Sequence, residues 1–237
     1  MTLELRQAEY ESRGRTRLHA TSITITPGSV TAIVGRNGAG KSTLLALMAA
    51  ELRPTSGDVL VDGDPLASLS ARDLAQRRAL LSQDQAVAFS FTVRDVVSWG
   101  RHCWSGTPQA HQDDQIIDAT MRDQGVAHLA TRRVTELSGG ERQRVQLARV
   151  RAQRAPVLLL DEADAALDLE GRHHLAETVR GEASSGTAVV LVSHDVQRML
   201  TAADRLIVVE AGRVVIDSTV ASVDTDQLAR ALGVSAL

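Results

Sequence analysis

Apolar positions in this chain follow two patterns, and each predicts a different kind of strand. Residues 30–34, 157–160 and 188–192 are almost entirely apolar, as expected for strands of a sheet that is buried on both faces. Residues 22–26 instead alternate between polar and apolar, which is typical of a strand with one exposed face. The chain is therefore expected to combine a buried sheet with edge-type strands.

Helical spacing of apolar residues marks most of the segments between these strands. Helices are expected at residues 41–52 and 168–183 and near the C-terminus, and shorter strands at residues 59–61, 79–82, 205–209 and 213–216. Strands that alternate with helices predict a parallel sheet with helices on its faces. From about residue 84 to residue 154 the pattern is helical, as at Val93, Val96 and Val97. This block is expected to be an insertion between two strands of the sheet.

The 237 residues are expected to form a single α/β domain. Its core and a β subdomain would comprise residues 1–83 and 155–237, with a helical subdomain at about residues 84–154. Aromatic residues make up only 2% of the chain, so the core must be built mainly from Leu, Val, Ile and Ala. A net charge of -3 gives no basic patch that argues for nucleic acid.

Cysteine content and hydropathy predict a soluble chain in a reducing compartment. The single cysteine, Cys103, excludes an intramolecular disulfide. The first residues lack the apolar segment of a secretory signal, and no apolar run approaches the roughly 18 to 20 residues that span a bilayer. A role at a membrane would therefore require a partner.

A glycine-rich stretch joins the apolar run at 30–34 to the helix expected from residue 41. It consists of Gly35, Arg36, Asn37, Gly38, Ala39, Gly40, Lys41, Ser42 and Thr43. A buried strand that turns through glycines into a helix is the context of a phosphate-binding loop (P-loop), because backbone N–H groups and the helix N-terminus form an anion site there. An incidental glycine-rich turn is the alternative, and the flanking strand and helix favour the phosphate loop.

Lys41 and Ser42 are the side chains expected to act within this loop. Lys41 would reach the β- and γ-phosphates of a nucleotide, and the Ser42 hydroxyl would bind Mg²⁺. Lys41 is also the only lysine in the chain. A compact ammonium fits under phosphates where a planar guanidinium does not, so a lysine at this one position supports the assignment.

Two further segments predict chemistry around a nucleotide. Asp161 and Glu162 end an apolar strand, where Asp161 would hold Mg²⁺ and Glu162 would orient or deprotonate the attacking water. Ser138, Gly139, Gly140 and Glu141 form a capping box with exposed backbone N–H groups, and thus a second anion site at a helix N-terminus. Taken alone, residues 161–162 could be only an acidic turn, and residues 138–141 could be only a capped helix.

Together these segments resemble those of an ATP-binding cassette (ABC) ATPase. Residues 35–43 match the Walker A motif of that family, residues 157–162 its Walker B motif, and residues 137–141 its signature motif. Gln83 falls at the Q-loop, Ala166-Leu167-Asp168 at the D-loop, and His194 at the switch histidine. These motifs occur in the family's order and cover nearly the whole chain.

The resemblance implies a P-loop NTPase core with an antiparallel β subdomain and a helical insertion. It also implies ATP and Mg²⁺ as cofactors, and a two-fold dimer in which each signature motif caps the ATP held by a second copy of the chain. His194 would contact the γ-phosphate. Gln83 would touch Mg²⁺ or the attacking water and act as a hinge to the helical insertion.

The chain departs from the family pattern at two places. The family usually has an aromatic residue before the second strand to stack on adenine, and that position is Ser12. Tyr10 would lie on the same strand face as Ser12 if the strand were regular, so Tyr10 is the expected adenine contact. Ala163-Asp164 replaces the commoner Pro-Thr pair after the Walker B motif, which is expected to alter the rigidity of the turn more than the chemistry.

The segment after the Q-loop is similar to that of importers of haem, iron-siderophore and cobalamin. It runs from Phe89 through Phe91 to Trp99, with Trp104 close behind, so it holds most of the aromatics. Such importers pair two ATPase subunits with two polytopic membrane permease subunits, and a substrate-binding protein takes part indirectly. Aromatics are enriched at interface anchors. They would here meet the permease, although Phe89 and Phe91 are equally expected as core residues of the insertion.

The predicted function is the ATPase of such an importer, at the cytoplasmic face of the membrane and without nucleic acid as a partner. Three alternatives stay open: a soluble ABC ATPase acting on nucleic acid or ribosomes, an ABC exporter ATPase, and a P-loop kinase. A kinase would have no use for residues 137–141. Scattered histidines such as His102, His111 and His173 show no recurring ligand spacing, so no haem or metal site is expected at these histidines.

Overall fold

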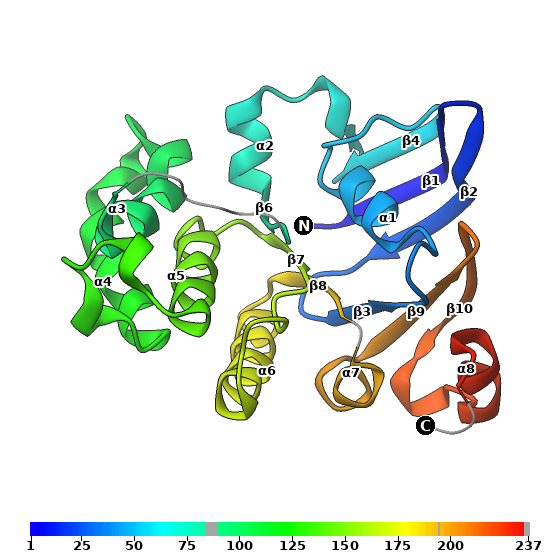
Figure 1. Cartoon of the computed structure of the whole chain (residues 1–237). Coiled ribbons are helices and arrows are strands. Elements are labelled where there is room, and N and C mark those ends of the chain that lie inside the picture. Colours follow the sequence, from blue (N-terminus) through cyan, green and yellow to red (C-terminus); the bar gives the residue numbers. More distant parts are fainter. Residues whose placement is uncertain (84–89, 194, 235–237) are drawn as a thin grey trace.

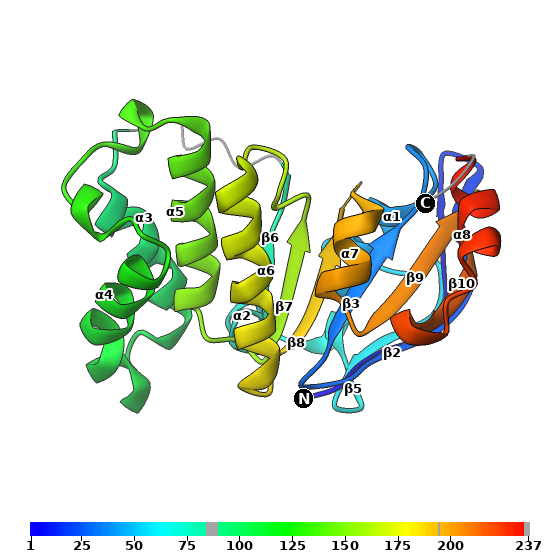
Figure 2. The same ribbon diagram turned by 90° about the horizontal axis from the view of Figure 1, so that it is seen from below.

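The computed structural model describes residues 1–83, 90–193 and 195–234. Two sheets lie beside a group of helices in these parts of the chain (Figures 1 and 2). The strands are β1 (Leu3–Ser12), β2 (Arg15–Ile25), β3 (Val30–Val34), β4 (Ser56–Val61), β5 (Asp64–Pro65), β6 (Arg78–Leu81), β7 (Val157–Asp161), β8 (Ala188–Val192), β9 (Arg205–Glu210) and β10 (Arg213–Thr219).

The α-helices are α1 (Lys41–Met48), α2 (Ala71–Arg77), α3 (Val93–Ser98), α4 (Asp113–Asp123), α5 (Gly139–Ala152), α6 (Leu169–Ser184), α7 (Val196–Ala202) and α8 (Thr225–Leu232). Short 3₁₀ helices are η1 (Leu66–Ser68), η2 (Trp99–Trp104), η3 (Pro108–Gln112), η4 (Ala127–Leu129), η5 (Val134–Glu136) and η6 (Val220–Ser222). Within the described residues, none of the helices is both long enough and apolar enough to cross a lipid bilayer.

The larger sheet has the strand order β10-β9-β3-β8-β7-β6. Its neighbouring strands are parallel, except that β10 runs antiparallel to β9. β3 and β8 are buried along their whole length, as their apolar sequences predict. Because β8 separates β3 from β7 and all three are parallel, the loops that follow them leave the same edge of the sheet.

The smaller sheet is antiparallel and has the order β2-β1-β4-β5. Within it, β1 is irregular: its pairing with β2 shifts register three times, the last shift falling between Tyr10 and Glu11, and Gln7 has a φ of 47°. An extra residue at a bulge breaks the alternation of faces. The regular strand that would place Tyr10 and Ser12 on one face is therefore not what β1 forms.

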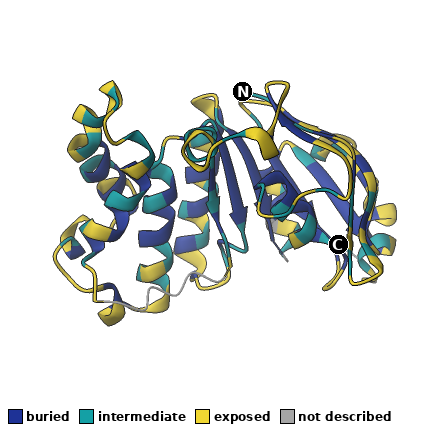
Figure 3. Ribbon diagram, turned by 90° about the horizontal axis from the view of Figure 1, so that it is seen from above, coloured by how far each residue is buried: buried dark blue, intermediate teal, exposed yellow. Residues whose placement is uncertain are grey.

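Two apolar clusters hold the sheets and their helices together. The first lies around α1 and joins both sheets. The second joins the opposite face of the larger sheet to α6, α7 and α8 (Figures 2 and 3). α1 ends earlier than the expected residue 52, because Ala50 adopts a left-handed φ of 56°.

Sequence periodicity missed α2 and α7. α2 has no buried residue, so it lacks the apolar stripe that marks a helix in sequence. Its start does carry a signal, because the Ser70 side chain accepts a hydrogen bond from the backbone N–H of Asp73. α7 is only seven residues long, too short for its periodicity to be clear.

A third apolar cluster lies within the helical group formed by α3, α4 and α5. The helix α5 belongs to two clusters: Val145 and Ala148 pack among α3 and α4, whereas Leu147 and Val150 pack with the larger sheet. The helical group is therefore fastened to the sheet through α5. Subdomain boundaries at about residues 84 and 154 stay a prediction.

Candidate active site

The loop between β3 and α1 has the backbone that a phosphate loop requires. Gly38 and Gly40 have φ values of 75° and 109°, in the region that favours glycine. At Gly35 an added Cβ would lie 2.2 Å from the carbonyl oxygen of Val209, so a side chain would collide with β9. α1 begins at Lys41, and no side chain of the described residues caps its N-terminus. Its first N–H groups are therefore open to an anionic ligand.

Lys41 lies buried at the centre of this loop. Its side chain is 6% exposed, and Nζ donates hydrogen bonds to the carbonyl oxygens of Gly35 at 2.8 Å and Arg36 at 3.1 Å. Burial lowers the pKa of Lys41, and the negative charges of Glu162 and Asp161 oppose this shift. The ammonium is thus held by two acceptors of its own loop, which phosphate oxygens can replace.

The predicted carboxylates lie at the same edge of the sheet. Asp161 is the last residue of β7 and pairs with Val192 of β8, which in turn pairs with Ile33 of β3. Glu162 follows with a left-handed φ of 50°, and its N–H donates to the carbonyl oxygen of Val192 at 3.0 Å. This conformation is uncommon for glutamate, and it turns the chain sharply at the end of the strand.

Gln83 reaches this carboxylate pair from the neighbouring strand. It follows β6, whose Leu81 pairs with Leu160 of β7. Its Nε2 donates to Oε2 of Glu162 at 2.7 Å. The structure therefore brings the side chains of Gln83 and Glu162 into contact, although 79 positions separate them in the sequence.

The donor set at this edge suits Mg²⁺. Ser42 offers a hydroxyl in the first turn of α1, Asp161 a carboxylate and Gln83 an amide oxygen. Mg²⁺ prefers oxygen ligands, and it commonly keeps only one or two protein carboxylates together with phosphates and waters. Among the described residues no group of three or more His, Cys, Asp or Glu side chains is placed to hold a metal ion by itself. The residues present thus fit a metal that arrives with a phosphate ligand.

The signature segment, residues 137–141, forms the N-terminus of α5. The Ser138 hydroxyl accepts from the N–H of Glu141 at 3.3 Å, and the Glu141 carboxylate accepts from the N–H of Ser138 at 2.8 Å. Hydrogen bonds to the Ser138 backbone and side chain lower the pKa of Glu141. The predicted capping box is confirmed, and it leaves the N–H groups of Gly139 and Gly140 without a side chain above them.

The signature segment lies beside the loop that follows β7 in the same chain. A Cβ added to Gly139 would be 3.9 Å from Cβ of Ala166, and one added to Gly140 would be 3.6 Å from its carbonyl oxygen. Gln143, one turn further along α5, donates from Nε2 to the carbonyl oxygen of Ala163 at 3.0 Å. Gln143 carries no local sequence signal for this contact, because its partner lies 20 residues away and no short pattern connects the two.

Asp164 makes a contact that the sequence did not indicate. Its Oδ2 accepts a hydrogen bond from Oγ of Ser193 at 2.7 Å. Ser193 is fully buried at the end of β8, and its Oγ also accepts from the N–H of Asp195 at 3.0 Å. The Ala163-Asp164 pair, which replaces the commoner Pro-Thr pair of the family, therefore makes a polar contact that was not expected. The sequence had suggested only a change in the rigidity of the turn.

Tyr10 and the remaining loop residues have varied surroundings. Tyr10 is half-buried and packs against the cluster around α1. Of the residues in the phosphate loop not yet placed, Ala39 is buried, Thr43 is half-buried, and Arg36 and Asn37 are exposed. The Arg36 guanidinium lies next to Gly233 at the end of α8. His194 and Phe89 lie outside the described residues.

Most of the aromatics after Gln83 are held within the helical group. Trp104 donates from its indole N–H to the carbonyl oxygen of Gln153 at 2.7 Å, and the buried Arg101 lies 5.5 Å from its ring centroid. Trp99 packs edge-on against Phe91, with ring centroids 5.0 Å apart. Phe91 is 39% exposed, whereas Trp99 and Trp104 are half-buried, so Phe91 has the largest exposed fraction of these three aromatics.

Comparison with protein families gives one match that spans most of the chain. The family model described as "ABC transporter" matches residues 18–165. A hemin import ATP-binding protein of Nocardia farcinica is 46% identical to the chain, over 96% of the chain and 81% of the relative. A protein of the same name from Rhodococcus jostii is 44% identical, over 91% of the chain and 74% of the relative. A cobalamin import ATP-binding protein of Halobacterium salinarum is 45% identical, over 90% of the chain and 54% of the relative.

Solved structures match over a similar length. An ATP binding subunit of an ABC transporter superposes with a TM-score of 0.85 at 19% identity, over 98% of this chain and 94% of the other. At this low identity the likeness shows the fold alone. The cbiO1 protein of Clostridium perfringens is described as part of the ABC transporter complex cbiONQ. It superposes with a TM-score of 0.80 at 28% identity, over 92% of this chain and 88% of the other.

Proposed function

The chain belongs to the ABC transporter family and is an ATPase of that family, and from this premise we propose that it powers a membrane importer of haem, an iron-siderophore or a cobalamin. The observation that carries the proposal is the joint placement of Lys41, Glu162 and Gln83 at one edge of the sheet. The two relatives named hemin import proteins above are similar over most of their length as well as most of the chain. That likeness favours an importer over an exporter and over a protein that acts on nucleic acid.

Hydrolysis is proposed to begin with the phosphates of ATP in the loop at residues 35–43. Lys41 gives up its bonds to the carbonyl oxygens of Gly35 and Arg36 and binds the β- and γ-phosphates, for which its buried ammonium is already oriented. The N–H groups at the start of α1 bind the remaining phosphate oxygens. Arg36, Asn37, Gly38, Ala39, Gly40, Ser42 and Thr43 complete the cradle.

Glu162 is proposed as the base that accepts a proton from the attacking water, with His194 at the γ-phosphate. Mg²⁺, held by Ser42, Asp161 and Gln83, supplies charge neutralisation at the phosphates when bound. In the described structure the amide of Gln83 is hydrogen-bonded to Glu162, so one oxygen of this carboxylate is engaged. Gln83 must release Oε2 of Glu162 before that oxygen can accept the proton.

The signature segment is proposed to cap ATP held by a second copy of the chain. Its capping box leaves two glycine N–H groups open for an anion, and the segment borders the loop at residues 163–166 rather than α1. In the views of the whole chain, the strands of the larger sheet separate α5 from α1 (Figure 2). A head-to-tail pair of copies would supply each ATP with the two anion sites that one copy holds apart.

Membrane permease subunits are the proposed second partner, with a substrate-binding protein acting through them. They would hold the chain at the cytoplasmic face of the membrane. Phe91 and Trp99, close after the Gln83 hinge, present an aromatic pair of which one ring is partly exposed. Tyr10 is kept as the proposed adenine contact, although its half-buried position limits the area it can offer.

A Glu162→Gln variant tests the ATPase mechanism. It removes the base while keeping the shape of the side chain, so we expect it to bind MgATP, to turn over at least about 10²-fold more slowly, and to accumulate as a dimer in size-exclusion chromatography. The wild type without nucleotide is the control. A monomer at saturating MgATP, or hydrolysis at the wild-type rate, would refute the roles given to Glu162 and to the second copy.

Uptake in the source organism tests the transport assignment. Deletion of the gene should abolish uptake of haem, of an iron-siderophore or of cobalamin, and only the wild-type gene, not Glu162→Gln, should restore it. The wild-type protein should also co-purify with a polytopic membrane protein. Unchanged uptake of all three compounds, together with a nuclease-sensitive assembly, would favour the alternative that acts on nucleic acid or ribosomes.

A further inference from the structure

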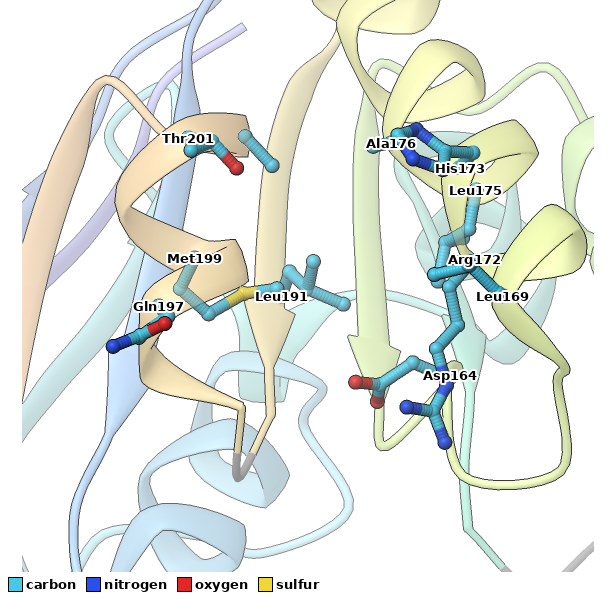
Figure 4. A pocket seen from close by; sticks show the side chains of 11 residues that line it. Asp164, Leu169, Arg172, His173, Leu175, Ala176, Leu191, Gln197, Met199 and Thr201 are labelled. Atoms are coloured by element: carbon cyan, nitrogen blue, oxygen red, sulfur yellow. The ribbon is translucent and has the colours of Figure 1, made fainter.

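The side chain of Asp164 joins two loops at the carboxyl edge of the larger sheet. It lies in the loop after β7, and its Oδ2 accepts from Oγ of Ser193 at the end of β8, 29 residues further along the chain. The distance of 2.7 Å is that of a hydrogen bond to a charged acceptor. Figure 4 shows the Asp164 carboxylate below α6, facing across a cavity of about 300 Å³ that separates α6 from α7.

The Ser193 hydroxyl both donates and accepts a hydrogen bond. While it donates to Asp164, it accepts from the N–H of Asp195 at 3.0 Å, and its side chain is fully buried. The two residues on either side of position 194 are thus tied to one oxygen atom, and that oxygen is tied to Asp164. A shift of the Asp164 carboxylate must disturb Ser193 and its bond to Asp195, because Ser193 has no solvent contact that could replace the lost acceptor.

The loop that carries Asp164 is itself held in place. The N–H of Ala165 donates to the carbonyl oxygen of Glu162 at 3.1 Å, and the N–H of Leu167 donates to that of Asp164 at 3.2 Å. From the other side, Gln143 of α5 donates to the carbonyl oxygen of Ala163 at 3.0 Å. Hydrogen bonds and the backbone at residues 163–164 therefore connect the helix of the signature segment to Ser193 and Asp195.

We propose that Asp164 is a positioning residue at the end of β8: by holding the Ser193 hydroxyl it fixes Ser193 and the N–H of Asp195, and it links both to the signature helix α5. The inference rests on the proposed function, in which His194 meets the γ-phosphate. A carboxylate suits the task because it accepts strongly from a buried hydroxyl. A hydrophobic residue at position 164 would leave the Ser193 hydroxyl without its acceptor.

The test compares Asp164→Ala, Ser193→Ala and the double variant in the full-length protein. Both single variants should lower kcat by about tenfold or more, and the double variant should lower it no further, because both substitutions remove the same contact. Asp164→Asn, whose amide oxygen still accepts from Ser193, should recover most of the activity. Glu177→Ala, which removes an exposed carboxylate of α6, should behave like the wild type.

Nucleotide affinity separates positioning from general structural damage. The affinity for ADP should stay within about twofold of the wild type in both single variants, while preference for a non-hydrolysable ATP analogue over ADP should fall. A merely structural contact would weaken both nucleotides together. Loss of ADP affinity, full activity of Asp164→Ala, or losses that multiply in the double variant would each overturn the inference.

Failure of this inference is distinguishable from failure of the proposed function. If the wild type hydrolyses ATP and Glu162→Gln does not, yet Asp164→Ala and Ser193→Ala are both fully active, only the role of Asp164 is refuted. If the wild type has no ATPase activity at all, the proposed function fails, and the role of Asp164 fails with it. Because Ser193→Ala reports on the same contact, poor folding of Asp164→Ala alone leaves the test decisive.

Discussion

Gly100 lies where η2 crosses α5, and its replacement by alanine is a sharp test of how the helical group is packed. An added Cβ would be 2.1 Å from the carbonyl oxygen of Arg149 and 3.1 Å from the amide nitrogen of Gln153. Both are backbone atoms of the α5 segment, so rotation of a side chain cannot relieve the contact. The two elements must separate by about 1 Å, and overpacking of this kind typically costs about 1 to 3 kcal/mol.

The same displacement should reach the active site. α5 begins with the signature segment and contributes Leu147 and Val150 to the cluster under the larger sheet. Moving α5 therefore disturbs the proposed cap on ATP, while the phosphate loop at β3 and α1 is untouched. We expect Gly100→Ala to lower the free energy of unfolding in urea by about 1 to 3 kcal/mol and to lower kcat, with the affinity of the monomer for MgATP unchanged.

Gly181→Ala is the matched control, because it makes the same chemical change within α6. An added Cβ there meets nothing within 4 Å, and Gly181 is exposed and has no left-handed φ. Alanine in place of glycine inside a helix should raise stability by up to about 1 kcal/mol. If Gly100→Ala proved as stable and as active as Gly181→Ala, the inference that η2 and α5 are in close backbone contact at Gly100 would be wrong.

Three further predictions concern single side chains. Lys41 is the only lysine, so an amine-acylating reagent should label only Lys41 and the N-terminus, and MgATP should suppress labelling at Lys41 alone; equal labelling with and without MgATP would contradict its phosphate role. Hydrogen bonds from the Thr92 side chain and backbone lower the pKa of Asp95 below its ordinary 3.8, so its contribution to stability is present above that pH and lost as the pH falls through the folded value. The stability deficit of Asp95→Asn in urea should therefore shrink on acidification, and a deficit that is constant with pH would refute this. Trp104→Phe should cost about 1 kcal/mol by removing the bond to Gln153, whereas no change in the urea midpoint would mean that this bond does not stabilise the helical group.

The parts of the fold that the sequence predicted are those with a local signal. β3, β7 and β8 are continuous apolar runs, and the capping box at Ser138 and Glu141 spans only four residues, so each could be found within a short window. The bulges of β1 and the seven residues of α7 carry no comparable local pattern, and α2 showed only a capping signal at Ser70. α7 is held by the packing of Met199 and Ala202, whereas α2 is held by hydrogen bonds from Arg72 and Gln76 to the carbonyl oxygen of Cys103, and neither is visible in a short window of sequence.

Contacts across the site could be predicted only in part. That Gln83, Asp161 and Glu162 gather at one edge follows once β6 and β7 are parallel neighbours, because parallel strands end at the same edge. The bond between Asp164 and Ser193 does not follow in the same way. It depends on the left-handed turn at Glu162, which redirects the chain and which no residue type in the loop announces.

The attachments of α5 constrain how the chain can move. Its middle packs in two apolar clusters at once, through Val145 on one side and Leu147 on the other. Near its N-terminus Gln143 is bonded to the loop after β7, and beyond its C-terminus Gln153 donates to the carbonyl oxygen of Arg78 at 2.8 Å. A rotation of the helical group about the larger sheet must carry the signature segment with it and must strain or break the bond between Gln143 and Ala163. Because that loop also holds Ser193 through Asp164, a partner that pushes on the helical group would be felt at the end of β8 as well as at the signature segment. In the importer proposed above, coupling between the membrane partner and the nucleotide would therefore have two routes, one through Gln83 and one through Gln143.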